Sequence, residues 1–191
     1  MLQAQLKELL LQALEHERGG TLIYQSAVEC AIDARLRKEW SKYLQQTEHH
    51  VAVLTDLCTS MGLDPGERTP GCMVVHHMGK SLVVAMKMSL AEGNLEAAQL
   101  VACDCVVLAE TKDHANWELI GECAKAETAE TKAILKQAYD EVEDEEDEHL
   151  YHTKGWCREL WLKSLGLNAV LPPPEEKADV RSAIEAARVK A

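Results

Sequence analysis

The sequence predicts an all-α protein, most simply a four-helix bundle with one additional helix. Apolar residues make up 47% of the chain, but aromatic residues make up only 4% and Phe is absent. The core must therefore consist of Leu, Val, Ala, Ile and Met, a composition that favours helices over sheets. No window alternates with a period of two for long enough to indicate a strand. Long segments instead repeat apolar residues every three or four positions, as the buried face of a helix does.

The first two helices are expected from continuous apolar stripes. The first covers about residues 2–38 and is interrupted at Gly19-Gly20. The second covers about residues 37–61, with a stripe that begins at Trp40. Gly62 occupies the position that follows a helix end, and a Pro-Gly turn comes directly after it.

Three further long helices and a short one follow after a polar loop. The long ones are expected at about residues 72–92, 95–125 and 128–165. The first of these would lie in the long connection between the second and third helices of the bundle. Pro172–Pro174 cannot continue a helix, and a short helix is expected at about 179–189. The sequence therefore predicts a bundle domain over residues 1–168 and a Pro-rich tail over 169–191.

Charge and composition exclude several classes of protein. The chain has 32 acidic and 20 basic residues, a net charge of −12. A field of this sign repels phosphate backbones, so binding to nucleic acid is not expected. The longest stretches without Asp, Glu, Lys or Arg, Thr69–Gly79 and Ser164–Pro174, are too short to span a bilayer. The amino terminus carries acidic residues early and lacks a small-residue cleavage site, which argues against a signal peptide.

The seven cysteines do not form a metal-binding or disulfide pattern. No C-x-x-C occurs, and Cys103 and Cys105 on one helix would point about 160° apart. We interpret the cysteines as small buried apolar residues in a reducing compartment, which predicts a cytoplasmic location.

The informative residues are ionisable groups at helix positions where the apolar period calls for a core residue. They are Glu17, His50, Glu110, Glu146 and His149. Burying an unpaired carboxylate costs several kcal/mol, so a bundle that buries three needs compensating positive charge. A divalent metal ion is an economical source of this charge, because carboxylate oxygen and imidazole nitrogen suit iron, manganese or zinc.

Each group also has a purely structural interpretation. Glu17 could lie at a solvated helix edge, Glu110 could pair with His114 one turn further on, and His50 could be a satisfied core histidine. The acidic run at 141–148 is interpreted as solvated surface, apart from Glu146 and Glu143 on its apolar side. Surface or structural positions are also expected for His49, His76 and His77.

The candidate residues occur in a pattern that repeats. Tyr24 follows Glu17 by seven residues, and Trp117 follows Glu110 by seven. Thr47-x-x-His50 on the second helix is echoed by Glu146-x-x-His149 on the fifth. Two helical hairpins that each supply a Glu and an x-x-His element are the way in which a bundle assembles a two-metal site.

At these residues the sequence resembles the ferritin-like superfamily, the di-iron or di-manganese carboxylate bundles that include rubrerythrins and bacterioferritins. The crossover helix and Glu110-x-x-Asp113 also resemble bacterial stress-associated ferritin-like proteins of unknown function. The resemblance covers about residues 5–165 and implies a ferritin-like four-helix bundle with a crossover helix and a short C-terminal helix. It further implies that the ligands are Glu17, His50, Glu110, Glu146 and His149, with Tyr24, Thr47, His114 and Trp117 as neighbours that shape the pocket.

The sequence departs from the family pattern at one ligand position. The second helix has Thr47 where the family has a glutamate. Two divalent ions bring four positive charges, whereas the three candidate glutamates supply three negative ones. Asp113, one turn beyond Glu110, is the candidate for the fourth carboxylate, with Glu143 and Glu48 as the next choices. If none of them reaches the site, it would be mononuclear, weakened or empty.

The leading functional hypothesis is a metal-binding protein with two iron or manganese ions that acts on O2, peroxide or Fe(II). A second hypothesis is a ferritin-fold structural or interaction protein without a metal centre, and a third is a zinc metallohydrolase built on a bundle. No rubredoxin-like C-x-x-C pair is present for a second redox centre. A homodimer is expected, formed through the tail or through the fifth helix, which carries Trp156 and Trp161.

Overall fold

The computed structural model describes residues 3–189, and all regular secondary structure in this range is helical. The long helices are α1 (Gln3–Cys30), α2 (Ala34–Ser60), α3 (Pro70–Ala91), α4 (Leu95–Ala126) and α5 (Ala129–Ser164), and the short ones are α6 (Pro174–Lys177) and α7 (Ala183–Val189). The predicted all-α class is therefore confirmed. Among the described helices, none has a stretch long and apolar enough to cross a membrane. Residue 2 of the first expected helix and residues 190–191 of the tail lie outside the described residues.

The first helix boundary was predicted wrongly, because α1 ends at Cys30 and not near residue 38. Asp33 caps the start of α2 by accepting a hydrogen bond from the backbone N–H of Arg35 at 2.9 Å. The side-chain oxygen of Gln99 on α4 accepts hydrogen bonds from the backbone N–H groups of Ile32 and Asp33, both at 2.8 Å. This long-range contact fixes the turn, and the helical pattern of the sequence does not reveal it.

Gly19 and Gly20 do not interrupt α1, contrary to expectation. They mark close approaches between helices instead. A Cβ atom on Gly19 would lie 3.9 Å from Cα of Gly79 on α3, and one on Gly20 would lie 3.1 Å from Cγ2 of Thr47 on α2. The two glycines therefore allow α1 to pack closely against two neighbours at once.

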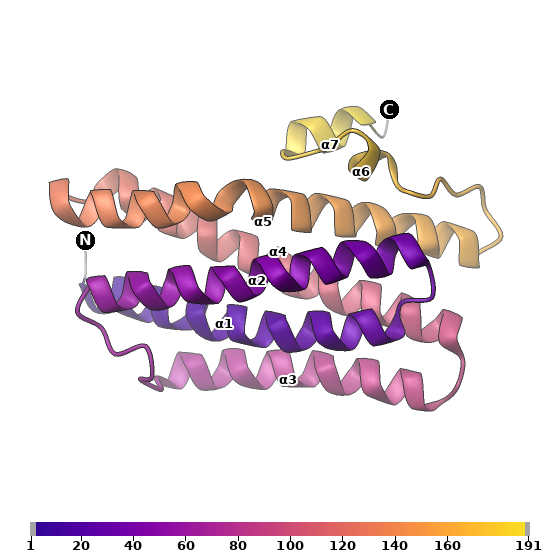
Figure 1. Ribbon diagram of the computed structural model, residues 1–191, viewed down its shortest axis with the longest axis horizontal. Helices are drawn as coiled ribbons and strands as arrows, with labels where there is room; N and C mark the ends of the chain where they lie inside the picture. Colours follow the sequence, from indigo (N-terminus) through magenta and orange to yellow (C-terminus); the bar gives the residue numbers. More distant parts are fainter. Residues whose placement is uncertain (1–2, 190–191) are drawn as a thin grey trace.

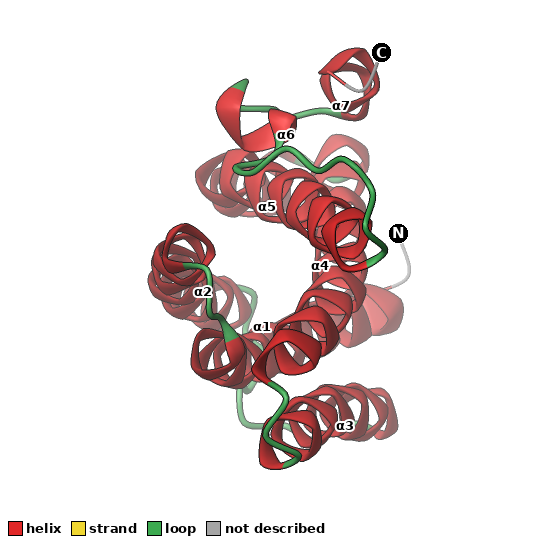
Figure 2. Ribbon diagram, turned by 90° about the vertical axis from the view of Figure 1, so that its right-hand side faces the viewer, coloured by secondary structure: helices red, strands yellow, loops and turns green. Residues whose placement is uncertain are grey.

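Four of the long helices form a closed ring. α1 packs against α2, α2 against α5, α5 against α4, and α4 against α1, as the end-on view in Figure 2 shows. α1 and α5 run in one direction and α2 and α4 in the other, so neighbours in the ring are antiparallel (Figure 1). α3 lies outside the ring against α1 and α4, and it carries the chain from one end of the bundle back to the other.

The interior of the bundle has two apolar clusters, one towards each end. One contains Tyr24, Trp40, Val106 and Trp156, and the other contains Leu10, Leu14, Leu54, Trp117 and Val142. In each helix of the ring, the polar residues singled out from the sequence lie between a residue of the first cluster and a residue of the second. The fold therefore places a polar layer at mid-length, closed off on both sides by apolar side chains.

The tail packs on α5 through α6 (Figure 1). Glu175 of α6 is 1% exposed, and both of its oxygens accept hydrogen bonds from Arg158 on α5. α6 begins at Pro174. Proline has no backbone N–H, and at the first position of a helix this costs no hydrogen bond, because an N–H there has no acceptor within the helix. The short helix expected at about 179–189 is present as α7, which starts four residues later than expected.

Candidate metal centre

The six residues proposed as ligands come together in the polar layer, from all four helices of the ring. Glu17 lies on α1, His50 on α2, Glu110 and Asp113 on α4, and Glu146 and His149 on α5. None of the six is more than 4% exposed. The solvated helix edge considered for Glu17 is therefore wrong, because this carboxylate is completely buried.

The carboxylate of Glu146 lies at the middle of the cluster. Its Oε1 atom is 2.9 Å from Nδ1 of His50 and 3.7 Å from Nδ1 of His149. Potential ligand atoms lie within 4.8 Å of one another in two groups, one formed by His50, Glu146 and His149 and the other by Glu17, Asp113 and Glu146. Glu146 belongs to both groups, so a single carboxylate lies between two positions that a cation could occupy.

The cluster has the right donors for a metal ion and lacks partners of its own. Five of the six residues have a buried side-chain atom without a hydrogen-bond partner: Glu17 Oε2, Glu110 Oε2, Asp113 Oδ1, Glu146 Oε2 and His149 Nδ1. Buried polar atoms are almost always paired, and five unpaired atoms in one place require an explanation. Divalent iron, manganese or zinc would be coordinated by this set of oxygen and nitrogen atoms. The residues therefore fit a metal centre.

The outer nitrogens of both histidines are held by hydrogen-bond acceptors. Nε2 of His50 lies 2.8 Å from Oε2 of Glu145, and Nε2 of His149 lies 3.1 Å from Oε1 of Gln46. Both acceptors favour a proton on Nε2, which leaves the lone pair of Nδ1 directed at the cluster. Histidine ligands of metal sites are oriented in this way.

Trp117 orients a carboxylate ligand in a similar manner. Its indole N–H donates a hydrogen bond of 2.8 Å to Oε1 of Glu17. The second oxygen of Glu17 is one of the atoms without a partner. The predicted proximity of Trp117 to the site is therefore present as a direct contact with a candidate ligand.

Burial and crowding of negative charge shift the pKa values of the carboxyl groups upward. Burial, reinforced by the charge of Glu146, raises the pKa of Glu110 well above its ordinary value. Burial and the charge of Glu17 do the same for Asp113. Burial raises the pKa of Glu146 to about 7. In the absence of a metal ion these shifts favour the protonated carboxyl groups, and a metal ion would displace such protons.

The two histidines respond in opposite directions. Burial lowers the pKa of His149 well below its ordinary value, and the charge of His50 adds to this effect. Burial also acts to lower the pKa of His50, but hydrogen bonds to Glu145, Glu146 and Glu17 outweigh it and raise this pKa well above 6.5. In the absence of a metal ion, His50 is therefore the cation that the carboxylates share.

Two other predicted neighbours pack close to the site. The hydroxyl of Tyr24 is buried without a hydrogen-bond partner, and its ring centroid is 5.9 Å from that of His149. Thr47 is 2% exposed and packs its methyl group against Gly20. α1 and α2 therefore approach each other closely at Thr47.

The remaining predicted residues do not reach the cluster. Nε2 of His114 lies 2.7 Å from Oδ1 of Asp147, so its partner is not Glu110. Glu143 is partly exposed and lies beside Tyr139, where it acts together with burial to raise the pKa of the phenol. Glu143 lies three residues before Glu146, so its side chain points towards the edge of α5. Glu48 is exposed and lies outside the bundle interior.

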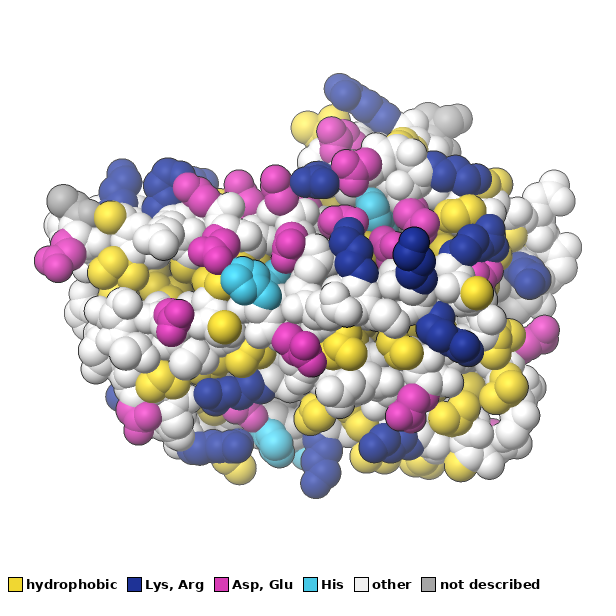
Figure 3. Space-filling model, viewed as in Figure 1, with side chains coloured by type: hydrophobic (Ala, Val, Ile, Leu, Met, Phe, Trp, Pro, Cys, Tyr) yellow, Lys and Arg dark blue, Asp and Glu magenta, His cyan; other side chains and the backbone are white. Residues whose placement is uncertain are grey.

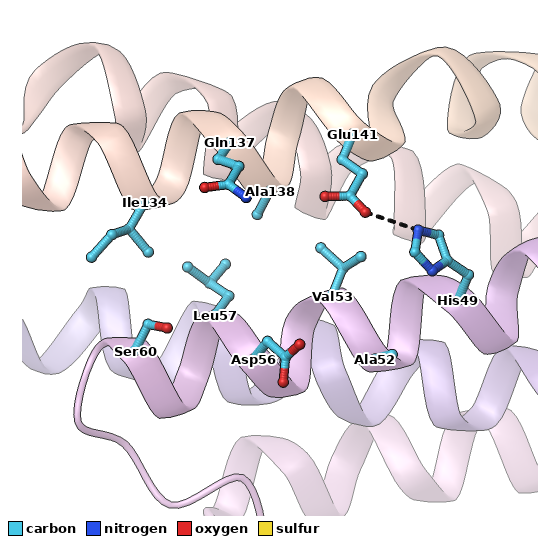
Figure 4. A pocket seen from close by; sticks show the side chains of 10 residues that line it. All are labelled: His49, Ala52, Val53, Asp56, Leu57, Ser60, Ile134, Gln137, Ala138 and Glu141. Atoms are coloured by element: carbon cyan, nitrogen blue, oxygen red, sulfur yellow. Dashed lines mark hydrogen bonds and ion pairs between the residues drawn. The ribbon is translucent and has the colours of Figure 1, made fainter.

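Solvent comes close to the cluster on the side where α2 and α5 meet. Glu145, which binds His50, is one-third exposed there. A groove of about 180 Å³ continues from this point between the second half of α2 and the first half of α5. The ion pair of His49 and Glu141, with a 3.0 Å separation between Nε2 and Oε1, lies along it (Figure 4). At the α2–α5 seam the side chain of Glu145 therefore connects the buried His50 with the solvent-exposed surface.

Gln46 and Glu145, which hold the two histidines, were not predicted from the sequence as part of the site. They directly precede two predicted residues, Thr47 and Glu146. The signal that could have found them is chemical, because a histidine ligand needs an acceptor for its second nitrogen. Periodicity alone assigns both residues to the solvated side of their helices.

No protein-family model, curated protein or solved structure matches this chain.

Proposed function

We propose that this chain is a ferritin-like metalloprotein that holds two divalent iron or manganese ions and uses them in redox chemistry with O2 or peroxide, or in iron handling. The observation that carries the proposal is the convergence of six buried ligand residues from four helices, five of which have a ligand atom without a hydrogen-bond partner. Glu17, Glu110, Asp113 and Glu146 supply four negative charges, which balance the four positive charges of two divalent ions. Asp113 thus provides the carboxylate that Thr47 does not.

The arrangement of the helices also supports the ferritin-like assignment. Two antiparallel hairpins, α1–α2 and α4–α5, are joined by the crossover helix α3. Two helices contribute glutamates, and α5 contributes Glu146 and His149 at i and i+3. Apart from α2, which contributes His50 without a glutamate, this is the distribution of ligands in carboxylate-bridged two-metal bundles.

Each residue has a distinct part in such a centre. Glu146, which belongs to both groups of ligand atoms, would help to hold the ions together with Nδ1 of His50 and Nδ1 of His149. Glu145, Gln46 and Trp117 hold ligands in position through hydrogen bonds, and the apolar clusters above and below exclude bulk water. When bound, two such ions supply Lewis acidity and one-electron redox chemistry to a small oxidant.

Metal content per chain tests the proposal. The protein is loaded anaerobically with Fe(II) or Mn(II) and desalted, and its metal content is measured by elemental mass spectrometry. We expect at least two ions for the wild type, fewer for Glu146→Gln, and the wild-type number for the control Glu143→Gln on the same helix. A wild type without bound metal would overturn the proposal. Consumption of O2 by the Fe(II)-loaded protein then separates a redox centre from a zinc hydrolase.

A second candidate is a ferritin-fold structural or interaction protein without a functional metal centre. The 2.9 Å pair of His50 and Glu146, which partly neutralises the cluster from within, favours it. In that case Glu17→Ala and Glu146→Ala would leave the response of stability to added metal unchanged. The expected homodimer stays a prediction for either function.

A further inference from the structure

A second group of ligand-type side chains lies one turn along α5 from the metal centre, on the same α2–α5 seam. Glu39 of α2 and Glu148 and His152 of α5 place ligand atoms within 4.8 Å of one another. We call these three residues the outer group. Glu148 and His152 are four residues apart and therefore project from the same face of α5.

The ring edge of His152 that carries Nδ1 faces oxygen atoms. Nδ1 lies 3.4 Å from Oε1 of Glu39, 3.9 Å from Oε1 of Glu148 and 3.1 Å from the hydroxyl of Tyr43. Tyr43 donates its only proton to Glu39 at 2.5 Å. Because the facing oxygens are then acceptors, this edge requires either a proton on Nδ1 or a cation next to it.

His152 is almost completely buried. It is 2% exposed, and its other ring nitrogen, Nε2, has no hydrogen-bond partner in the described part of the chain. Glu39 and Glu148 have side chains that are 17% and 10% exposed. The outer group therefore consists of a buried imidazole and two carboxylates nearer the surface.

The ammonium group of Lys42 lies on the solvent side of the outer group and could be replaced by another cation. Nζ of Lys42 is 2.5 Å from Oε1 of Glu148, and the lysine side chain is 48% exposed. On the face shown in Figure 3, Lys and Arg side chains gather over the first half of α2, and acidic side chains line α5. A half-exposed lysine can move its ammonium group into solvent at little cost.

The tail adds a further negative charge near this place. Glu176 of α6 accepts a hydrogen bond from the indole N–H of Trp156 at 2.5 Å. Burial and the charge of Glu39 raise the pKa of Glu176, so the two carboxylates act on each other. Glu39, Glu148 and Glu176 together favour a cation with more than one charge.

We propose that the outer group is a cation site separate from the metal centre, and that it binds one divalent transition-metal ion in place of the ammonium of Lys42. One imidazole and two carboxylates suit manganese, iron or zinc and leave coordination positions for water. The ring of Tyr43 lies between the two sites, with its centroid 4.2 Å from that of His149. The outer group is thus the more accessible site, next to the buried one.

Titration with Mn(II), followed by the electron paramagnetic resonance signal of the free ion, tests this proposal on the full chain. Glu148→Gln should lower the number of bound ions by one. Lys42→Gln should tighten binding of that same ion about tenfold, because it removes a competing positive charge. Lys38→Gln, which removes an exposed charge one turn earlier on α2, should change neither quantity.

A background without the metal centre separates this proposal from the proposed function. In the variant Glu17→Gln with Glu110→Gln, one ion should remain bound, and adding Glu39→Gln or Glu148→Gln should remove it. A single ion in the wild type that is lost with Glu148→Gln would support the outer site while the two-metal function fails. If a folded Glu148→Gln protein binds as many ions as the wild type, the outer site is refuted and the group is only a hydrogen-bond network. Circular dichroism establishes that each variant is folded.

Discussion

Replacing Glu146 by glutamine should stabilise the metal-free protein at pH 8 and not at pH 5. Burial raises the pKa of this carboxyl from 4.5 to about 7. A raised pKa in the folded state means that the folded protein binds a proton more tightly than the unfolded chain does. The resulting stability is fully present below about pH 4.5 and is lost as the pH rises to about 7.

The size of the effect follows from the same pKa values. The rise of 2.5, from 4.5 to about 7, corresponds to about 3 kcal/mol of unfolding free energy at about 1.4 kcal/mol per pKa unit. Glutamine has the shape of the protonated acid and no charge to bury. Above pH 7 the metal-free variant should therefore exceed the wild type by up to about 3 kcal/mol, less the value of any hydrogen bond that the amide fails to make.

Urea unfolding followed by circular dichroism measures this difference at pH 5 and pH 8, with a chelator and again with Mn(II). Metal at 100 times its dissociation constant should stabilise the wild type by about 2.7 kcal/mol and the variant by much less. Glu143→Gln, on the same helix but outside the cluster, is the matched control. The reasoning would be refuted if Glu146→Gln lowered the free energy of unfolding equally at pH 5 and pH 8, and if Mn(II) stabilised the variant as much as the wild type.

Three further predictions follow from contacts of the site and the tail. Trp117→Phe removes the donor to Glu17 and should weaken metal binding at least tenfold in a Mn(II) titration, with little change in helix content. Gln46→Ala removes an acceptor from a histidine ligand and should weaken binding 10- to 100-fold in the same titration. Arg158→Ala leaves Glu175 without its bidentate partner and should lower the free energy of unfolding by about 3 kcal/mol, measured with urea.

The outcomes that would contradict these predictions are distinct. Unchanged affinity in both Trp117→Phe and Gln46→Ala would mean that the hydrogen bonds do not orient ligands. An Arg158→Ala protein as stable as one with a change at the exposed Arg188 would mean that the tail contributes nothing to the folded state.

Much of the helical framework and of the candidate ligand set is visible in the sequence. Spacing of three and four residues fixes which face of each helix is buried, and a charged residue on that face stands out whatever surrounds it. Glu17, Glu110, Glu146, His50 and His149 were recognised on this basis, and all five are buried together at mid-bundle. Charge balance alone indicated that a fourth carboxylate was needed.

The sequence ranks Asp113 ahead of Glu143, but only the tertiary structure shows that Asp113 is buried and Glu143 is not. Each lies one turn from a ligand, and its burial depends on how its helix is rotated about its axis. The acceptors Gln46 and Glu145 and the outer group depend on the same rotation and on the register between α2 and α5, whose facing residues lie about a hundred positions apart in the chain. The end of α1 was likewise set by a contact from Gln99 on α4. Periodicity is a property of one helix, whereas these features arise between helices, where packing decides which side chains meet.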